Sequence, residues 1–204
     1  MSQPRTLVIA CGALARELAA LVRVNHLDHL KITCLPAIWH NHPERIAPSV
    51  RAKIRAARGK FAEILCLYGD CGTGGELDRM LEEEGVERIA GTHCYGFFAG
   101  TADFDALMDE EPGTFFLTDY LVRHFERLVI KGLGLDRFPQ LRDDYFGHYR
   151  RVVYLAQTED AALVVRAEAA AGRLGLAFET RFTGYGAMAA FVTRSAGSRN
   201  PAHG

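Results

Sequence analysis

Short apolar runs of strand length alternate with amphipathic segments through the first half of the chain. The runs are LVIA at 7–10, ITCLPAI at 32–38, ILCLY at 64–68 and VERIA at 86–90. The wholly apolar run LVIA is typical of a strand buried on both faces of a parallel sheet, and the other three are also of strand length. Between them, apolar residues recur at helical spacing, as in ALARELAALVRV. The alternation predicts an α/β fold, with a mostly parallel Rossmann-like sheet and helices on both of its faces.

The region 109–150 interrupts this alternation. A Pro-Gly turn precedes a short apolar stretch, and Thr118 or Asp119 can cap a helix that runs through Val129. A second helix, rich in aromatic and charged residues, follows. We therefore expect a helical insertion over about 109–150.

The strand pattern returns after the insertion, at 152–156 and 177–182. Thr158 or Asp160 can cap the helix between these two runs. We expect one α/β domain over residues 1–195, in which the sheet resumes after the insertion. The last residues, 196–204, have the composition of a flexible tail.

Composition and charge exclude two classes of partner. Hydrophobic residues make up 49% of the chain and charged residues 24%, and the net charge is −1, so no strong field would attract nucleic acid. No apolar run approaches the roughly 20 residues that span a bilayer, and the N-terminus does not resemble a signal peptide. We therefore expect a cytoplasmic protein whose five cysteines are thiols, metal ligands or buried small residues rather than disulfides.

Three cysteines come directly after predicted strands. Cys11, Cys71 and Cys94 occupy these positions, and His40 follows the second strand. The carboxyl ends of parallel strands meet at one edge of a sheet, which is where ligands bind in open α/β folds. The pattern predicts one thiol- and imidazole-rich site at this edge. Cys34 and Cys66 lie inside strands, where free cysteine is a common small apolar filler.

These residue types suit a soft or borderline metal. The predicted ligands are Cys11, Cys71 and Cys94, with His40 or His93. Zinc takes such donor sets, and a [4Fe–4S] cluster held by three cysteines would leave one iron free for a substrate. The sequence leaves the choice between the two metals open. Several glycines would let backbone amides approach sulfide or an anion closely, namely Gly12, Gly72, Gly74 and Gly75.

A metal-free alternative makes Cys71 a catalytic nucleophile beside a helix N-terminus. Asp70 would then be an acid/base group, or simply a turn residue. His42 forms an HxH pair with His40 and is either a ligand or a surface histidine. The turn GDCGTGG matches neither the dinucleotide fingerprint nor the P-loop. If the insertion is a lid, further side chains would line the site, and these are Thr114, Thr118 and Tyr145.

Several segments together resemble DUF1638, a family of unknown function. They are IACGALAREL, WHNHPERI, LYGDCGTGG, GTHCYGFFAG, GTFFLTDYLVRHFERLVIKGLGLDR and the late TGYG, and they extend over nearly the whole chain. The resemblance implies an α/β protein often associated, by gene neighbourhood, with corrinoid-dependent methyl transfer. It therefore implies a role in methyl-group metabolism, with a corrinoid protein or methyltransferase as a partner.

Three functions compete on this basis. The first is a metal- or cluster-dependent enzyme, a transferase or lyase, that acts on a small-molecule substrate. The second is a noncatalytic accessory protein that carries metal or binds a corrinoid protein. The third is a small-molecule-binding sheet protein with incidental cysteines.

Overall fold

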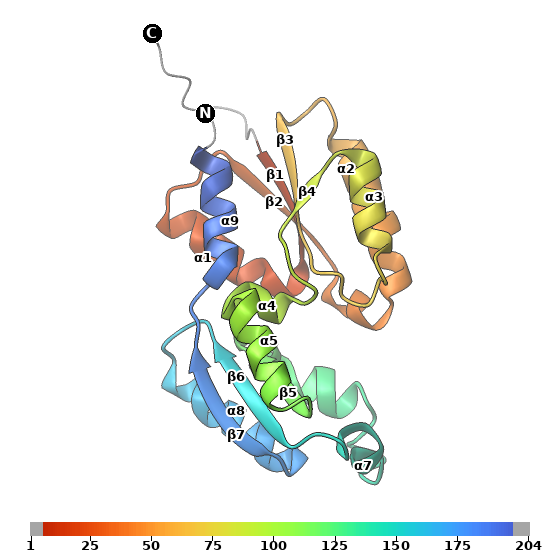
Figure 1. Cartoon of the computed structure of the whole chain (residues 1–204), viewed down its shortest axis with the longest axis vertical. Helices are drawn as coiled ribbons and strands as arrows, with labels where there is room; N and C mark the ends of the chain where they lie inside the picture. Colours follow the sequence, from red (N-terminus) through yellow and green to blue (C-terminus); the bar gives the residue numbers. More distant parts are fainter. Residues whose placement is uncertain (1–5, 198–204) are drawn as a thin grey trace. The chain divides into compact units, whose positions relative to one another are not determined.

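The structure is a computed structural model that describes residues 6–197, with side chains described to residue 194. The chain divides into two compact units. The first unit contains residues 1–97 and 186–204, and the second contains residues 98–185. Each unit has a parallel sheet of its own, so the chain is a mixed α/β protein (Figure 1).

The first unit is built on a four-stranded parallel sheet with the order β2-β1-β3-β4. Its strands are β1 (Thr6–Cys11), β2 (Leu30–Leu35), β3 (Glu63–Leu67) and β4 (Glu87–Arg88). The central strand β1 is buried along its whole length, as its apolar sequence predicts. The strand β1 lies between β2 and β3, so that Ala10 pairs with Cys34 of β2 on one side and with Leu67 of β3 on the other.

Helices cover both faces of this sheet, with α2 and α3 on one face and α1 and α9 on the other (Figure 1). The longer helices are α1 (Ala15–Val24), α2 (Ile46–Ala57), α3 (Glu76–Glu84) and α9 (Gly186–Gly197). Short turns of helix follow the strand ends, namely η1 (Gly12–Leu14), η2 (Ala37–Asn41), η3 (Pro43–Arg45) and α4 (Cys94–Ala99). A buried carboxylate, Glu84, joins α3 to α2 by accepting hydrogen bonds from Arg55 and Arg58.

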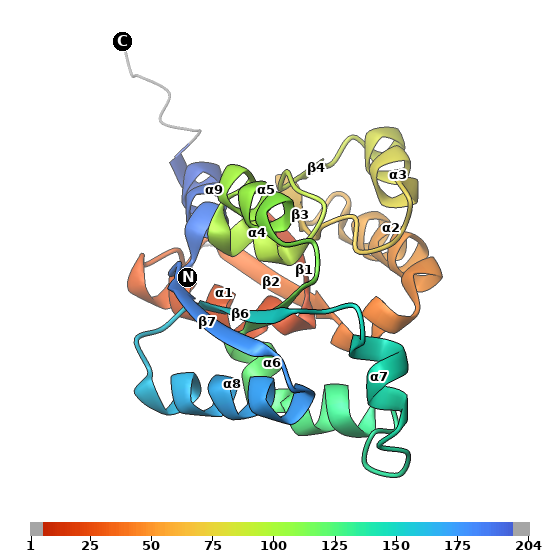
Figure 2. The same cartoon turned by 60° about the horizontal axis from the view of Figure 1, so that its bottom comes forward.

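The second unit has a three-stranded parallel sheet with the order β5-β6-β7. The strands are β5 (Thr114–Thr118), β6 (Arg151–Ala156) and β7 (Ala177–Phe182). One face packs on α6 (Asp119–Phe125) and α8 (Ala161–Leu174), which lie along the sheet in Figure 2. The remaining elements are α5 (Thr101–Glu110), η4 (Glu126–Lys131) and α7 (Leu141–Phe146).

The structure differs from the expected continuous sheet. The strands at 151–156 and 177–182 pair with β5 in a second sheet rather than extending the first one. The region 109–150 is also not wholly helical, because TFFLT at 114–118 forms β5. This run is as short and apolar as the strands before it, but it lies inside the expected helical insertion, directly before the N-cap of α6, and the sequence pattern therefore does not assign it to a strand.

Several local predictions are confirmed and others shift. Thr118 caps α6 and Asp160 caps α8, and each side chain accepts a hydrogen bond from a backbone amide. The predicted strand at 86–90 shortens to β4, and the loop around His40 is a turn of 3-10 helix. The predicted tail at 196–204 begins inside α9, and its residues 198–204 lie outside the described part of the chain.

No helix in the described part of the chain is long and apolar enough to cross a membrane.

Candidate thiol–imidazole site

The candidate site lies at the carboxyl edge of the first sheet and is built within the first unit. Cys11 ends β1, and His40 lies on η2, which follows β2 after Pro36. Cys71 lies in the turn between β3 and α3, and Cys94 begins α4 after β4. Because the four strands are parallel, all of these positions fall at the same edge.

The imidazole of His40 is the point at which the three thiols meet. Its Nδ1 lies 3.8 Å from the Cys11 sulfur and 2.9 Å from the carbonyl oxygen of Ala37. Hydrogen-bonding contacts with Cys11, Cys71 and Cys94, in that order of strength, raise the pKa of His40. If Nδ1 carries the proton, it donates a hydrogen bond to the Ala37 carbonyl oxygen, and the lone pair of Nε2 is left available to bind a metal.

Cys11 is the innermost of the three thiols, with 3% of its surface exposed. Its sulfur accepts a hydrogen bond from the Ala13 amide at 3.3 Å, so the side chain also caps η1. The turn after it is close-packed, because a Cβ at Gly12 would lie 2.8 Å from the Leu35 carbonyl oxygen. The absence of a side chain at Gly12 therefore allows the end of β1 to pack closely against the end of β2.

Cys71 lies half-buried on a turn that packs directly against the segment before Cys94. Its backbone is left-handed, with φ +49°, which is unusual for a residue other than glycine. The Cys71 amide donates to the Thr92 carbonyl at 3.2 Å. Gly69 allows this approach, since a Cβ there would lie 2.9 Å from the same oxygen. The two loops that carry Cys71 and Cys94 are thus joined at the backbone.

Asp70 organises the glycine-rich turn. Its carboxylate accepts hydrogen bonds from the Thr73 hydroxyl at 2.7 Å and from the Gly74 and Gly75 amides at 3.2 and 2.8 Å. Burial alone would raise the pKa of Asp70, but these bonds and one from the Gly72 amide outweigh it and lower the pKa. The amides of Gly72, Gly74 and Gly75, predicted to face a cofactor, instead bind this carboxylate. The predicted catalytic role of Asp70 stays a prediction.

The remaining predicted residues fall in different places. His42 is exposed and lies 3.7 Å from the Glu44 carboxylate, and the choice between a ligand and a surface histidine stays a prediction. His93 is exposed, whereas its neighbour Cys94 is half-buried beside His40. Cys66 is fully buried, which raises its pKa to about 12. Three candidate lining residues belong to the second unit, namely Thr114, Thr118 and Tyr145.

Sequence reasoning missed Tyr68. It follows β3 directly, and the register that pairs Ala10 with Leu67 places Tyr68 opposite Cys11. The side chain is 1% exposed, and its hydroxyl has no hydrogen-bond partner within the described residues. Burial raises the pKa of Tyr68, and the charge and hydrogen-bonding contact of the neighbouring Cys11 sulfur and the charge of Cys71 raise it further. The signal available in the sequence was a tyrosine at the end of an otherwise apolar strand.

The donor set fits a soft or borderline metal in its chemistry. Three thiols and one imidazole from separate elements converge, and zinc and iron–sulfur centres take such ligands. Over residues 6–197, no three His, Cys, Asp or Glu side chains already have the arrangement of a metal site. Metal binding would therefore require the thiols to turn from the imidazole towards a common centre, with loss of their protons.

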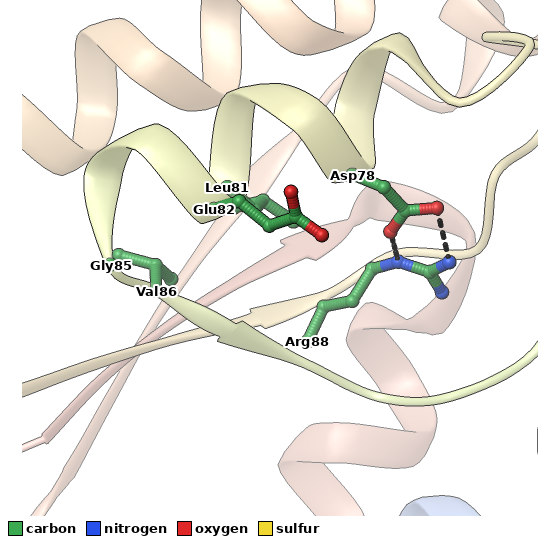
Figure 3. Close-up of a pocket in the computed structure, with 6 residues that line it drawn as sticks. All are labelled: Asp78, Leu81, Glu82, Gly85, Val86 and Arg88. Atoms are coloured by element: carbon green, nitrogen blue, oxygen red, sulfur yellow. Dashed lines mark hydrogen bonds and ion pairs between the residues drawn. The ribbon is translucent and has the colours of Figure 1, made fainter.

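A pocket elsewhere in the first unit contains no thiol or imidazole. It has a volume of about 310 Å³ and lies between α3 and β4 (Figure 3), lined by Asp78, Leu81, Glu82, Gly85, Val86 and Arg88. Arg88 forms a two-pronged ion pair with Asp78 and also donates to the carbonyl oxygens of Ile89 and Gly91. Its charge is thus used to tie α3 to β4, so this pocket is a weaker candidate than the thiol cluster.

Comparisons with known proteins found one family and one fold-level likeness. The family profile described as a protein of unknown function, DUF1638, matches residues 34–192. No curated protein matches the chain. Ornithine carbamoyltransferase from Pyrococcus furiosus shows a distant likeness, with 15% identity and a TM-score of 0.30. The match covers 87% of this chain but 54% of that one, so the chain spans about half the length of that structure.

Proposed function

Given that the chain belongs to the DUF1638 family of proteins of unknown function, we propose that it binds a zinc ion or an iron–sulfur cluster and acts through it on a small molecule. The observation that carries this proposal is the convergence of Cys11, Cys71 and Cys94 on the imidazole of His40.

Each proposed ligand has a distinct place in the site. Cys11 is buried and accepts an amide hydrogen bond, which suits a permanent thiolate ligand. Cys71 and Cys94 are half-buried, whereas His40 is exposed. Solvent would therefore reach the cluster from the side on which His40 lies. A metal at this position would supply Lewis-acid chemistry to a small molecule that entered from that side.

The fixed orientation of His40 supports a ligand role. Metal-bound histidines usually donate their second ring N–H to a carbonyl or carboxylate, which fixes the tautomer. Here the Ala37 carbonyl lies 2.9 Å from Nδ1, within the same turn of η2. That arrangement leaves Nε2 as the ligand atom.

Metal content tests the proposal directly. Protein purified anaerobically should carry about one zinc per chain, or about four irons with sulfide and visible absorption. Cys11→Ser, Cys71→Ser and Cys94→Ser should each lower the metal content severalfold. Cys34→Ser is the matched control, because Cys34 is a half-buried thiol of β2 outside the cluster, and it should keep the wild-type content.

Metal-free wild-type protein, or cysteine variants that retain the full metal content, would contradict the proposal. A second candidate function would then gain weight, in which Cys71 is a nucleophile. Its half-buried position, left-handed backbone and contact with His40 favour this role. Selective alkylation of Cys71 over the other thiols in metal-free protein would support it.

A role in methyl-group metabolism, with a corrinoid protein or a methyltransferase as partner, stays a prediction. Recovery of such a partner from cell extract would favour the noncatalytic accessory role.

A further inference from the structure

The hydroxyl of Tyr68 is a buried polar group without a partner at the edge of the thiol cluster. The side chain is 1% exposed, and its oxygen forms no hydrogen bond of normal geometry with a described residue, although the Cys11 sulfur is its hydrogen-bonding neighbour. Leaving such a group unpaired is costly, and native proteins do so rarely. The position therefore points to a partner that is present when the site is in its working state.

The geometry identifies which group that partner is. Ala10 of β1 pairs with Leu67 of the parallel strand β3. Cys11 is the next residue after Ala10, and Tyr68 is the next residue after Leu67, so the two lie opposite each other. Residues paired in this way present their side chains on the same face of the sheet. The Cys11 sulfur already accepts one hydrogen bond, from the Ala13 amide. A thiol is a weak acceptor, whereas a metal-bound thiolate is a charged one that binds donors more strongly.

We propose that Tyr68 is a positioning residue, which donates its hydroxyl hydrogen to the Cys11 sulfur when that sulfur is a metal-bound thiolate. This inference rests on the proposed metal site. The Ala13 amide and the Tyr68 hydroxyl would then hold the same sulfur, and they would fix its direction and moderate its charge. Groups that act on ligands in this way typically change metal affinity by about 10–100-fold.

Tyr68→Phe separates this role from a merely structural one. Removing a hydroxyl that has no partner in the metal-free protein should leave the thermal midpoint of that form unchanged or slightly higher. Zinc affinity, measured by competition with a chromophoric chelator, should fall by about 10–100-fold. In protein loaded with cobalt(II), the thiolate-to-metal absorption should move to longer wavelength, because the sulfur loses a hydrogen bond.

Tyr154→Phe is the control. Tyr154 is also fully buried, but its hydroxyl donates to Asp119 at 2.7 Å in the second unit. Its loss should lower the thermal midpoint and leave zinc affinity unchanged. Equal zinc affinity of wild type and Tyr68→Phe would overturn the inference while the metal site stands, and so would a lowered midpoint of the metal-free variant. Wild-type protein that binds no zinc or iron would overturn the proposed function and this inference together.

Discussion

Single residues show that the glycine-rich turn is built around an internal anion. The sequence GDCGTGG suggests a cradle for a bound anion, yet the carboxylate of Asp70 fills that place. The turn thereby holds Cys71 in a left-handed conformation, of a kind that costs about 1–3 kcal/mol elsewhere in proteins. Asp70 is thus a structural support for the thiol whatever its part in chemistry.

The lowered pKa of Asp70 predicts a dependence of stability on pH. Because the folded-state pKa lies below the ordinary aspartate value of about 3.9, the stabilisation is complete above that value and is lost as pH falls through the folded-state pKa. Asp70→Asn should lower the free energy of unfolding by about 1 kcal/mol at pH 7. The difference from wild type should shrink below about pH 4, as urea unfolding at several pH values would show.

A difference that stayed constant from pH 7 to pH 3 would show that the Asp70 charge does not matter. Asp105→Asn is a suitable control, because Asp105 is an exposed aspartate of α5.

Residue identity alone could not reveal the part that Tyr68 has. Cysteine and histidine attract attention as metal ligands, whereas a tyrosine at a strand end has many ordinary roles. Its relation to Cys11 depends on the pairing of β1 with β3 in one register, which no local pattern specifies. Likewise, the contrast between His40 and His42 follows from η2, since a turn of 3-10 helix separates side chains that a strand would align.

Among the elements, the contact between two loops decides whether Cys71 and Cys94 can share a ligand. The turn after β3 and the segment before α4 meet at Gly69 and Thr92, where a side chain on Gly69 would clash with the Thr92 carbonyl oxygen. Gly69 has no left-handed φ, so the requirement for glycine here is one of space alone.

Gly69→Ala should therefore push the two loops apart. Overpacking of this kind costs about 1–3 kcal/mol, and here it should also reduce metal content, because Cys71 and Cys94 would no longer reach one centre. Gly96→Ala is the matched control, because a Cβ at this α4 position would meet nothing within 4 Å apart from its chain neighbours and the backbone of its own helix. Metal analysis and thermal unfolding of both variants test the expectation. Full metal content in Gly69→Ala would show that the loop contact is dispensable.

The elements of the first unit could be predicted well because their strands are apolar and their helices amphipathic. The helix caps at Thr118 and Asp160 could also be predicted from the sequence, since each side chain binds a backbone amide within its own turn. The second sheet was not predictable in this way. A strand such as β5 has the same local pattern in either sheet, and its pairing with β6 is a choice made by tertiary packing.

At the scale of the whole molecule, all four proposed ligands belong to the first unit. They lie on separate segments, at the ends of β1 and β3 and on η2 and α4, and only the fold connects them. A metal ion bound to them would crosslink these segments and stabilise the state that binds it. The second unit, with a sheet and a core of its own, contributes no proposed ligand.

Amide hydrogen exchange over the whole chain, compared between metal-loaded and chelator-treated protein, tests the central claim most directly. The account predicts that metal removal weakens protection together in four segments of the first unit, namely 8–14, 36–42, 66–75 and 92–97. The strands β5 and β6 should be unaffected and serve as the internal control. Equal protection of the four segments in both samples, or a change confined to the second unit, would contradict the claim that these side chains form one metal centre.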